Sequence, residues 1–134
     1  MNDQELMQVA VEARKSAYAP YSGFFVGAAL LTRNGKLYTG CNIENASYTP
    51  TNCAERTAFF KAVSEGEREF EAIAIVGGKG EMPSDFCAPC GVCRQVMTEF
   101  CDGDFRILLG TPEKFEVHSL RSLFPLSFGK DDLK

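Results

Sequence analysis

The sequence contains no long hydrophobic run. Nowhere do apolar residues continue for the roughly 18 positions that a membrane-spanning helix needs. Residues 1–5 (Met-Asn-Asp-Gln-Glu) are polar and acidic, unlike the basic and then apolar start of a secretion signal. These two absences argue against a membrane partner and leave the cytoplasm as the expected compartment.

Positive charge is also scarce. Lys and Arg number 14 against 18 Asp and Glu, and they form no cluster along the chain. Because binding to a polynucleotide usually needs a basic face that neutralises phosphates, we expect no nucleic-acid partner and instead a small, weakly charged ligand. Histidine is nearly absent too. We expect the one residue of this type, His118, to pack at a surface or sheet edge.

The chain has the length of one ordinary domain, and we assign residues 1–134 to a single catalytic domain. Residues 2–18 have the apolar spacing of an amphipathic helix. Residues 24–32 and 36–43 are β-forming runs, and the Asn34-Gly35 pair between them is a strong signal for a hairpin turn.

After a polar loop over residues 44–52, helical and strand patterns alternate. The pattern predicts helices at 53–65, 90–100 and 119–124 and strands at 70–76, 105–109 and 114–117. We expect Thr51 or Asn52 to cap the first of these helices. The order predicts an α/β fold, a three-layer α-β-α domain around a central mixed sheet of about five strands. Its core is expected to contain four phenylalanines: Phe59, Phe60, Phe100 and Phe105.

Six cysteines are the most distinctive feature of the chain. Three disulfides would suit a small secreted protein, so metal binding is the better interpretation here. Cys90 and Cys93 are spaced to place both sulfurs on one face of a first helical turn, and Cys53 begins another helix. Helix N-termini favour thiolates, because their free N–H groups stabilise the anion. Three thiolates leave one position of a tetrahedral zinc site open, which is typical of a catalytic site.

Glu55 lies two residues after Cys53 and would stand beside the metal without binding it. Such a carboxylate can accept a proton from zinc-bound water and pass it to a substrate. Three thiolates exceed the charge of Zn²⁺ by one, which weakens the ability of the metal to acidify water. We hypothesise that Arg56 or Arg94 donates to the ligand sulfurs and withdraws this charge. For each arginine the alternative is a solvated position on the helix surface.

Cys87 supports a competing interpretation. Together with Cys53, Cys90 and Cys93 it could close a four-cysteine structural site, and the chain would then be a non-catalytic, zinc-stabilised binding module. Pro89 favours a helix that begins at Cys90, which leaves Cys87 in the loop before it. A closed site also gives Glu55 no role, so we prefer the open, catalytic site.

The motifs Cys53-Ala54-Glu55 and 89–93 (Pro-Cys-Gly-Val-Cys) resemble the signature of the zinc nucleoside and nucleotide deaminases, with Cys where many members have His at the first ligand position. Other stretches resemble the small cytidine deaminases in particular. These are residues 19–22 (Ala-Pro-Tyr-Ser) with Phe24, 26–29 (Val-Gly-Ala-Ala), 40–45 (Gly-Cys-Asn-Ile-Glu-Asn), and 123–125 (Leu-Phe-Pro) with Phe128. The resemblance covers almost the whole chain in order, although residues 77–86 depart from the usual sequence of the family.

The resemblance implies hydrolytic deamination of cytidine and 2′-deoxycytidine to uridine and 2′-deoxyuridine, with release of ammonia, in pyrimidine salvage. One Zn²⁺ per subunit would be bound by Cys53, Cys90 and Cys93. Glu55 would deprotonate the zinc-bound water, and the resulting hydroxide would attack C4 of the base. Glu55 would then protonate N3 and finally the departing amino group.

The substrate contacts are likewise implied by the resemblance. Asn42 and Glu44 would bind the ribose, particularly its 3′-hydroxyl, and being two apart on a strand they point the same way. Phe24 would pack against the base, and backbone groups near Ala54 would hold it. Family members with an all-cysteine site are typically homotetramers, in which a neighbouring subunit completes the pocket with the residues that correspond to Tyr48 and Phe128. A deaminase of a cytosine nucleoside antibiotic such as blasticidin S is the nearest alternative, disfavoured because those relatives lack the pair of Asn42 and Glu44.

Overall fold

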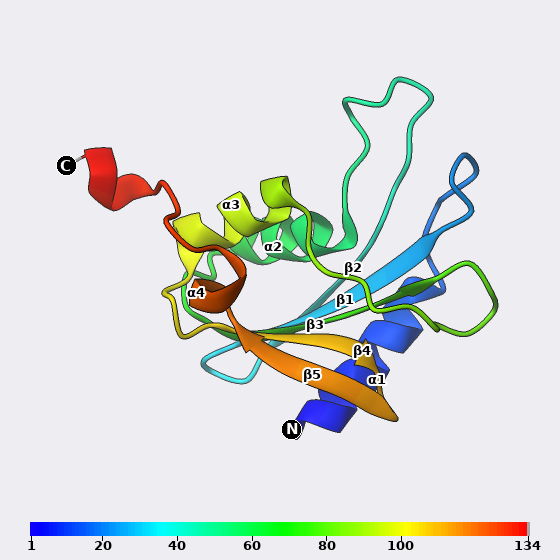
Figure 1. Cartoon of the computed structure of the whole chain (residues 1–134), viewed down its shortest axis with the longest axis horizontal. Helices are drawn as coiled ribbons and strands as arrows, with labels where there is room; N and C mark the ends of the chain where they lie inside the picture. Colours follow the sequence, from blue (N-terminus) through cyan, green and yellow to red (C-terminus); the bar gives the residue numbers. More distant parts are fainter. Residues whose placement is uncertain (134) are drawn as a thin grey trace.

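The structure is a computed structural model and describes residues 1–133. Its centre is a five-stranded sheet with the strand order β2-β1-β3-β4-β5 (Figure 1). The strands are β1 (Phe25–Thr32), β2 (Leu37–Cys41), β3 (Phe70–Gly78), β4 (Arg106–Thr111) and β5 (Lys114–Ser119). The helices are α1 (Asp3–Arg14), α2 (Ala54–Ser64), α3 (Gly91–Phe100), α4 (Leu120–Leu123) and the 3-10 helix η1 (Lys130–Leu133).

The sheet is mixed, as the sequence predicted. β1 pairs antiparallel with β2 and with β3, β3 pairs parallel with β4, and β4 pairs antiparallel with β5. The turn between β1 and β2 contains Gly35, whose φ of 88° lies in the region that favours glycine. A parallel pair needs a crossover connection, and α3 lies in the connection between β3 and β4.

Helices cover both faces of the sheet and complete the three expected layers. In Figure 1, α1 lies on one face, whereas α2 and α3 lie side by side on the other. The alternation of β3 separates the two halves of the core, because successive side chains of a strand point to opposite faces. Ala72 and Ala74 pack with α1, whereas Ile73 and Ile75 pack with α2 and α3.

Two details differ from the sequence prediction. The first helix ends at Arg14, not at residue 18, and Arg14 is buried, with its guanidinium donating to the backbone carbonyls of Phe25, Gly78, Gly80 and Glu81. Phe60 is 47% exposed, so its assignment to the core was wrong. Within residues 1–133, no helix has both the length and the apolar character needed to cross a membrane.

Gly40 fixes the distance between β2 and the N-terminal end of α2. A Cβ atom built on Gly40 would lie 2.3 Å from the backbone O of Ala54 and 2.6 Å from the backbone N of Ala58. Contacts this short do not occur for real side chains, so only glycine allows this approach. The start of α2, where the first sulfur ligand lies, is thereby held against the sheet.

Candidate metal centre and active site

The three predicted ligands lie at the starts of two neighbouring helices. Cys53 is the N-cap residue of α2 and Cys90 is the N-cap residue of α3, and Cys93 follows in the first turn of α3. Neither N-cap side chain makes a capping hydrogen bond. The predicted cap at Thr51 or Asn52 was therefore wrong. The sequence signal for a cap was misleading here because both helices begin with a sulfur that points toward the site.

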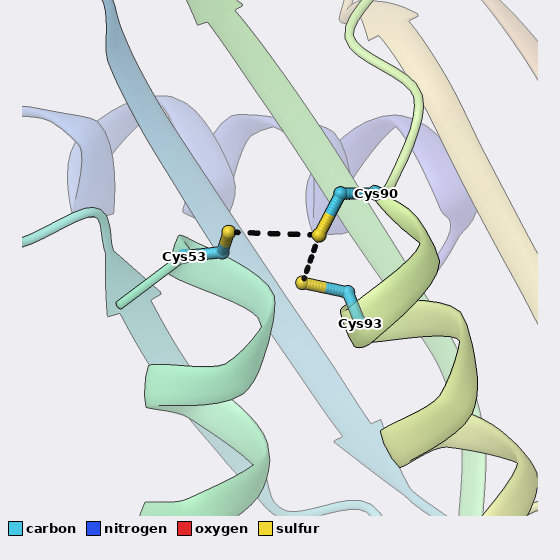
Figure 2. Close-up of side chains that lie close together, drawn as sticks. All are labelled: Cys53, Cys90 and Cys93. Atoms are coloured by element: carbon cyan, nitrogen blue, oxygen red, sulfur yellow. Dashed lines mark hydrogen bonds between the residues drawn. The ribbon is translucent and has the colours of Figure 1, made fainter. Parts of the chain in front are cut away.

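The sulfur atoms of Cys53, Cys90 and Cys93 converge between α2 and α3 (Figure 2). The Sγ atoms of Cys53 and Cys90 are 3.8 Å apart, those of Cys90 and Cys93 are 3.5 Å apart, and all three lie within 4.8 Å of one another. Sulfurs bound tetrahedrally at about 2.3 Å from a zinc ion would be about 3.8 Å apart. The spacing therefore fits one zinc ion, and the three thiol groups are the ligand type that zinc prefers.

Arg56 is the arginine that contacts the ligands. Its Nη2 donates to Sγ of Cys53 at 3.1 Å, while its Nε is buried and has no hydrogen-bond partner among the described residues. Burial opposes the charge of Arg56, but hydrogen bonds to the sulfurs of Cys53 and Cys93 outweigh this effect and raise its pKa above the usual value. A hydrogen bond from Cys93 and another from Arg56 outweigh burial at Cys53 and lower the pKa of Cys53 to about 5.

Arg94 is occupied elsewhere. Its Nε donates to the carbonyl O of Pro89 at 2.7 Å, and its Nη1 donates to the carbonyl O of Leu123. It therefore ties the loop before Cys90 to the end of α4. Of the two arginines in the sequence hypothesis, Arg56 has the position that could withdraw charge from sulfur.

Glu55 lies beside the sulfurs and is 4% exposed. Burial raises the pKa of Glu55 to about 7, and the nearby charge of Cys53 acts in the same direction. A carboxyl group whose pKa lies near neutrality can both accept and release a proton at the pH of a cell. The structure thus places a buried carboxyl group next to the sulfur cluster, and its role as a proton carrier stays a prediction.

Cys87 does not join the sulfur cluster. The group whose atoms lie within 4.8 Å of one another contains Cys53, Cys90 and Cys93 but not Cys87. Burial, followed by the negative charges of Glu55 and Cys53, raises the pKa of Cys87 to about 12, which keeps this thiol protonated. Every one of the six cysteines is free, so neither the disulfide interpretation nor the closed four-cysteine site is supported.

Asn42 and Glu44 both bind the backbone that precedes and begins β1. The Nδ2 of Asn42 donates to the carbonyl O of Phe24 at 2.8 Å, and its Oδ1 accepts from the N–H of Val26 at 2.9 Å. The Oε1 of Glu44 accepts from the N–H groups of Tyr21 and Ser22, at 3.0 Å each, and its Oε2 accepts from the hydroxyl of Ser22. These bonds from Ser22 lower the pKa of Glu44, which keeps it ionised.

A cavity of about 330 Å³ lies on the side of Glu44 and is lined by residues of the 21–22 and 44–51 segments: Tyr21, Ser22, Glu44, Asn45, Tyr48 and Thr51. Sequence reasoning missed Tyr21 and Ser22 as partners of Glu44. The available signal was the turn Tyr21-Ser22-Gly23 directly before Phe24, because a short turn presents consecutive N–H groups to an acceptor.

The remaining predicted site residues divide into two groups. Ala54 is buried in the core cluster that also contains Cys93, and Phe24 and Cys53 pack against this cluster. Tyr48 is 81% exposed and Phe128 is 58% exposed. Tyr48 lies on the long loop between β2 and α2, which projects at the top of Figure 1, whereas Phe128 lies in the C-terminal segment, which extends to the left. A single chain does not bring Phe128 and Tyr48 together.

Comparison with known proteins identifies similar chains. A family model described as the cytidine and deoxycytidylate deaminase zinc-binding region matches residues 1–109. The cytidine deaminase of Sporosarcina psychrophila is 49% identical over 134 residues, which cover 99% of this chain and 96% of that protein. A crystal structure of cytidine deaminase from Burkholderia pseudomallei has a TM-score of 0.88 and 47% identity, and the match covers 96% of this chain and 100% of that chain.

A deaminase that acts on an antibiotic is also similar to this chain, but less so than the cytidine deaminases above. The blasticidin-S deaminase of Bacillus cereus is 29% identical, over 96% of this chain and 94% of that protein. The difference in identity favours the nucleoside-directed group.

Proposed function

The chain belongs to the cytidine and deoxycytidylate deaminase family, and we propose that it catalyses the zinc-dependent hydrolysis of cytidine and 2′-deoxycytidine to uridine and 2′-deoxyuridine, with release of ammonia. The observation that carries this conclusion is the cluster of three cysteine sulfurs next to the buried carboxyl group of Glu55. A tetrahedral zinc ion held by these three sulfurs would keep one position for water or substrate, because Cys87 lies outside the cluster.

The zinc ligands in this proposal are Cys53, Cys90 and Cys93. Zinc supplies the Lewis acidity that makes a water molecule a good nucleophile at neutral pH. Arg56 acts on the ligands and not on the substrate. Its hydrogen bond to Cys53 withdraws negative charge from a thiolate set that would otherwise exceed the charge of the metal.

Glu55 moves the protons. It accepts one proton from the attacking water and delivers it to N3 of the pyrimidine as C4 is attacked. It then takes the proton of the new C4 hydroxyl group and passes it to the amino group, which leaves as ammonia while the C4 carbonyl forms. Water adds and ammonia departs, so no further reactant is needed. Burial suits Glu55 to this role, because a pKa near neutrality lets it carry the proton in both directions.

The nucleoside would be bound from the side of β1 and the loop after β2. Phe24 would pack against the base, backbone groups near Ala54 would hold it, and Glu44 would accept a hydrogen bond from the ribose 3′-hydroxyl. Asn42 already binds the backbone of Phe24 and Val26, so its contact with ribose would use its remaining amide hydrogen and lone pair.

We also propose that the working unit is a homotetramer. Phe128 is 58% exposed, and Tyr48 is 81% exposed although it lines the cavity beside Glu44, which supports a contribution of both side chains to the site of a neighbouring subunit. We further infer that residues 1–134 form one catalytic domain, since a single sheet uses strands from Phe25–Thr32 to Lys114–Ser119. A cytoplasmic location and a role in pyrimidine salvage stay predictions, testable by cell fractionation and by growth on cytidine as the pyrimidine source.

The decisive experiment follows the absorbance of cytidine as it is converted to uridine. The zinc-loaded protein should be active, and chelation should abolish activity until zinc is added back. Glu55→Gln should retain about one zinc per chain by metal analysis, yet lose at least about 100-fold in kcat. A parallel assay with blasticidin S should show much weaker turnover. No uridine from the zinc-loaded protein would overturn the proposal.

A further inference from the structure

We propose that Ser22 is a positioning residue for nucleoside binding, because its hydroxyl holds the carboxylate of Glu44 and the backbone of Phe24 at the same time. This inference rests on the proposed function, in which Glu44 receives the ribose 3′-hydroxyl and Phe24 packs against the base. Ser22 lies between these two groups in the structure and lines the same cavity as Glu44.

The hydrogen bonds form a directed chain. The N–H of Phe24 donates to Oγ of Ser22 at 3.0 Å, and the hydroxyl of Ser22 donates to Oε2 of Glu44. A hydroxyl that accepts one bond can still donate its single hydrogen, so both bonds exist together and reinforce each other. The orientation of the carboxylate and the position of the aromatic residue are thus linked through one side chain.

The second carboxylate oxygen of Glu44, Oε1, is held by backbone hydrogen bonds. This atom accepts from two backbone N–H groups, those of Tyr21 and Ser22, so the carboxylate cannot rotate without losing three bonds. The Oε2 atom keeps lone-pair capacity after it accepts from Ser22. That atom is therefore free to accept a sugar hydroxyl in a fixed direction, without a cost in ordering the side chain when the substrate binds.

Gly23 gives the turn the shape that this arrangement needs. Its φ is 66°, in the left-handed region, and its N–H donates to the carbonyl O of Ala19 at 3.0 Å. The reversal of the chain at Gly23 lets the N–H of Phe24 meet the hydroxyl two residues earlier. The turn, the hydroxyl and the carboxylate act as one preorganised support for the sugar.

The test compares Ser22→Ala with Ser16→Ala. Ser16 is an exposed serine in the segment after α1, and its hydroxyl makes no hydrogen bond within residues 1–133, so Ser16→Ala is a matched control. The assay substrates are cytidine and 3′-deoxycytidine. Ser22→Ala should raise KM for cytidine by about three- to tenfold with little change in kcat, the loss expected for one ordinary hydrogen bond. KM for 3′-deoxycytidine should rise by a smaller factor, because this substrate lacks the hydroxyl that Glu44 would accept and is affected only through the link to Phe24.

Two further variants separate this inference from the ribose assignment itself. Ser22→Thr keeps the hydroxyl and should restore KM to within about twofold of the unchanged protein, while thermal unfolding of all variants confirms folding. Ser22→Ala should add nothing to the effect of Glu44→Gln, because both changes remove the same support.

The outcomes are distinct. If Glu44→Gln raises KM for cytidine and Ser22→Ala does not, the inference about Ser22 is overturned and the ribose assignment stands. Equal effects of Ser22→Ala on cytidine and 3′-deoxycytidine would also overturn it, because the bond from Ser22 to Glu44 would then contribute nothing to binding of the 3′-hydroxyl. If Glu44→Gln leaves KM unchanged, the ribose assignment fails, and the inference fails with it.

Discussion

At the scale of single residues, the site combines groups that would be costly without one another. Glu55 is a buried carboxyl group, and Arg56 beside it has a buried Nε with no partner within residues 1–133. A bound cation offsets part of the free-energy cost of burying these groups, because its charge favours both an ionised Glu55 and the thiolates that Arg56 contacts. The residues next to the sulfurs are therefore tuned for the metal-loaded state and not for the stability of the empty one.

The pH dependence of stability tests the burial of Glu55. Its pKa is raised to about 7 from an ordinary 4.5, so the native state binds more protons than the unfolded state between these values. The free energy of unfolding of the metal-free protein should therefore fall as pH rises through this window. Glu55→Gln removes the effect, and should be more stable than the unchanged protein at pH 8 by up to about 3 kcal/mol, but not at pH 4.5.

Urea unfolding of the chelated proteins at both pH values measures this difference. A constant difference between the two proteins across the range would contradict the assignment of a raised pKa to Glu55.

Arg56 and Arg94 form a matched pair, because each is one residue from the motif and carries the same charge. Arg56→Gln should weaken zinc retention by about 10- to 100-fold, since zinc must then compete with a proton on Cys53. Arg94→Gln should instead lower the stability of the metal-free protein by about 1–2 kcal/mol, because it loses bonds to two backbone carbonyls. Competition with a chelator and urea unfolding give the two readouts. An equal loss of zinc from both variants would refute the separate roles.

At the scale of elements, the two ligand-bearing helices are placed by the face of the sheet that they share and by a contact between themselves. α2 packs closely on β2, whereas α3 crosses between β3 and β4. Their first turns meet because both helices cover the same face of one sheet. The fold therefore sets the distance between Cys53 and the pair of Cys90 and Cys93, and a small shift of one helix would open the metal site.

The close approach of β2 and α2 at Gly40 is the contact at which a substitution would shift a ligand-bearing helix. Gly40→Ala would place a methyl group 2.3 Å from the carbonyl O of Ala54, so α2 must move outward. We expect a loss of about 1–3 kcal/mol in stability together with weaker zinc retention. Gly91→Ala is the control, because a Cβ at that helical position meets nothing within 4 Å, and its stability should be unchanged or higher. Thermal unfolding that is the same for both variants would show that the contact is unimportant.

At the scale of the whole molecule, one chain leaves its substrate side open. The loop over residues 44–52 projects away from the sheet and the C-terminal segment extends from the other side of α3 (Figure 1). Tyr48 and Phe128 are both exposed aromatic side chains in one chain. This shape agrees with the proposed assembly, in which each subunit completes the site of another.

Complementation tests that assembly directly. Phe128→Ala should reduce kcat/KM by about tenfold, because an aromatic wall of the pocket is lost. Coexpression of Phe128→Ala with Glu55→Gln should produce mixed oligomers in which some sites combine an intact Glu55 from one chain with an intact Phe128 from another. Activity of the copurified mixture should therefore exceed the sum of the two variants. Simple additivity, or a monomeric mass by light scattering, would contradict the proposed tetramer.

The chemistry of the site could be read from sequence because it depends on short-range spacing. Cys90 and Cys93 are three residues apart at the start of one helix, and Cys53 and Glu55 stand at the start of another, so the sulfur ligands and the carboxyl group beside them were local properties of the sequence. The alternation of the strands and the hairpin at Gly35 were local as well, which is why the mixed sheet was predictable. The helix caps were not, because the sequence shows Thr51 and Asn52 but not the direction in which their side chains point.

Contacts between distant segments were decided by tertiary structure alone. Cys87 differs from Cys90 only by its place in a loop, and the path of that loop removes it from the cluster. Arg56 and Arg94 look equivalent in sequence, yet packing directs one to sulfur and the other to the carbonyls of Pro89 and Leu123. Ser22 meets Glu44 because β1 and β2 lie side by side. Spacing along the chain determines which groups share a helical turn. Only the packing of the fold determines which groups from distant segments come into contact.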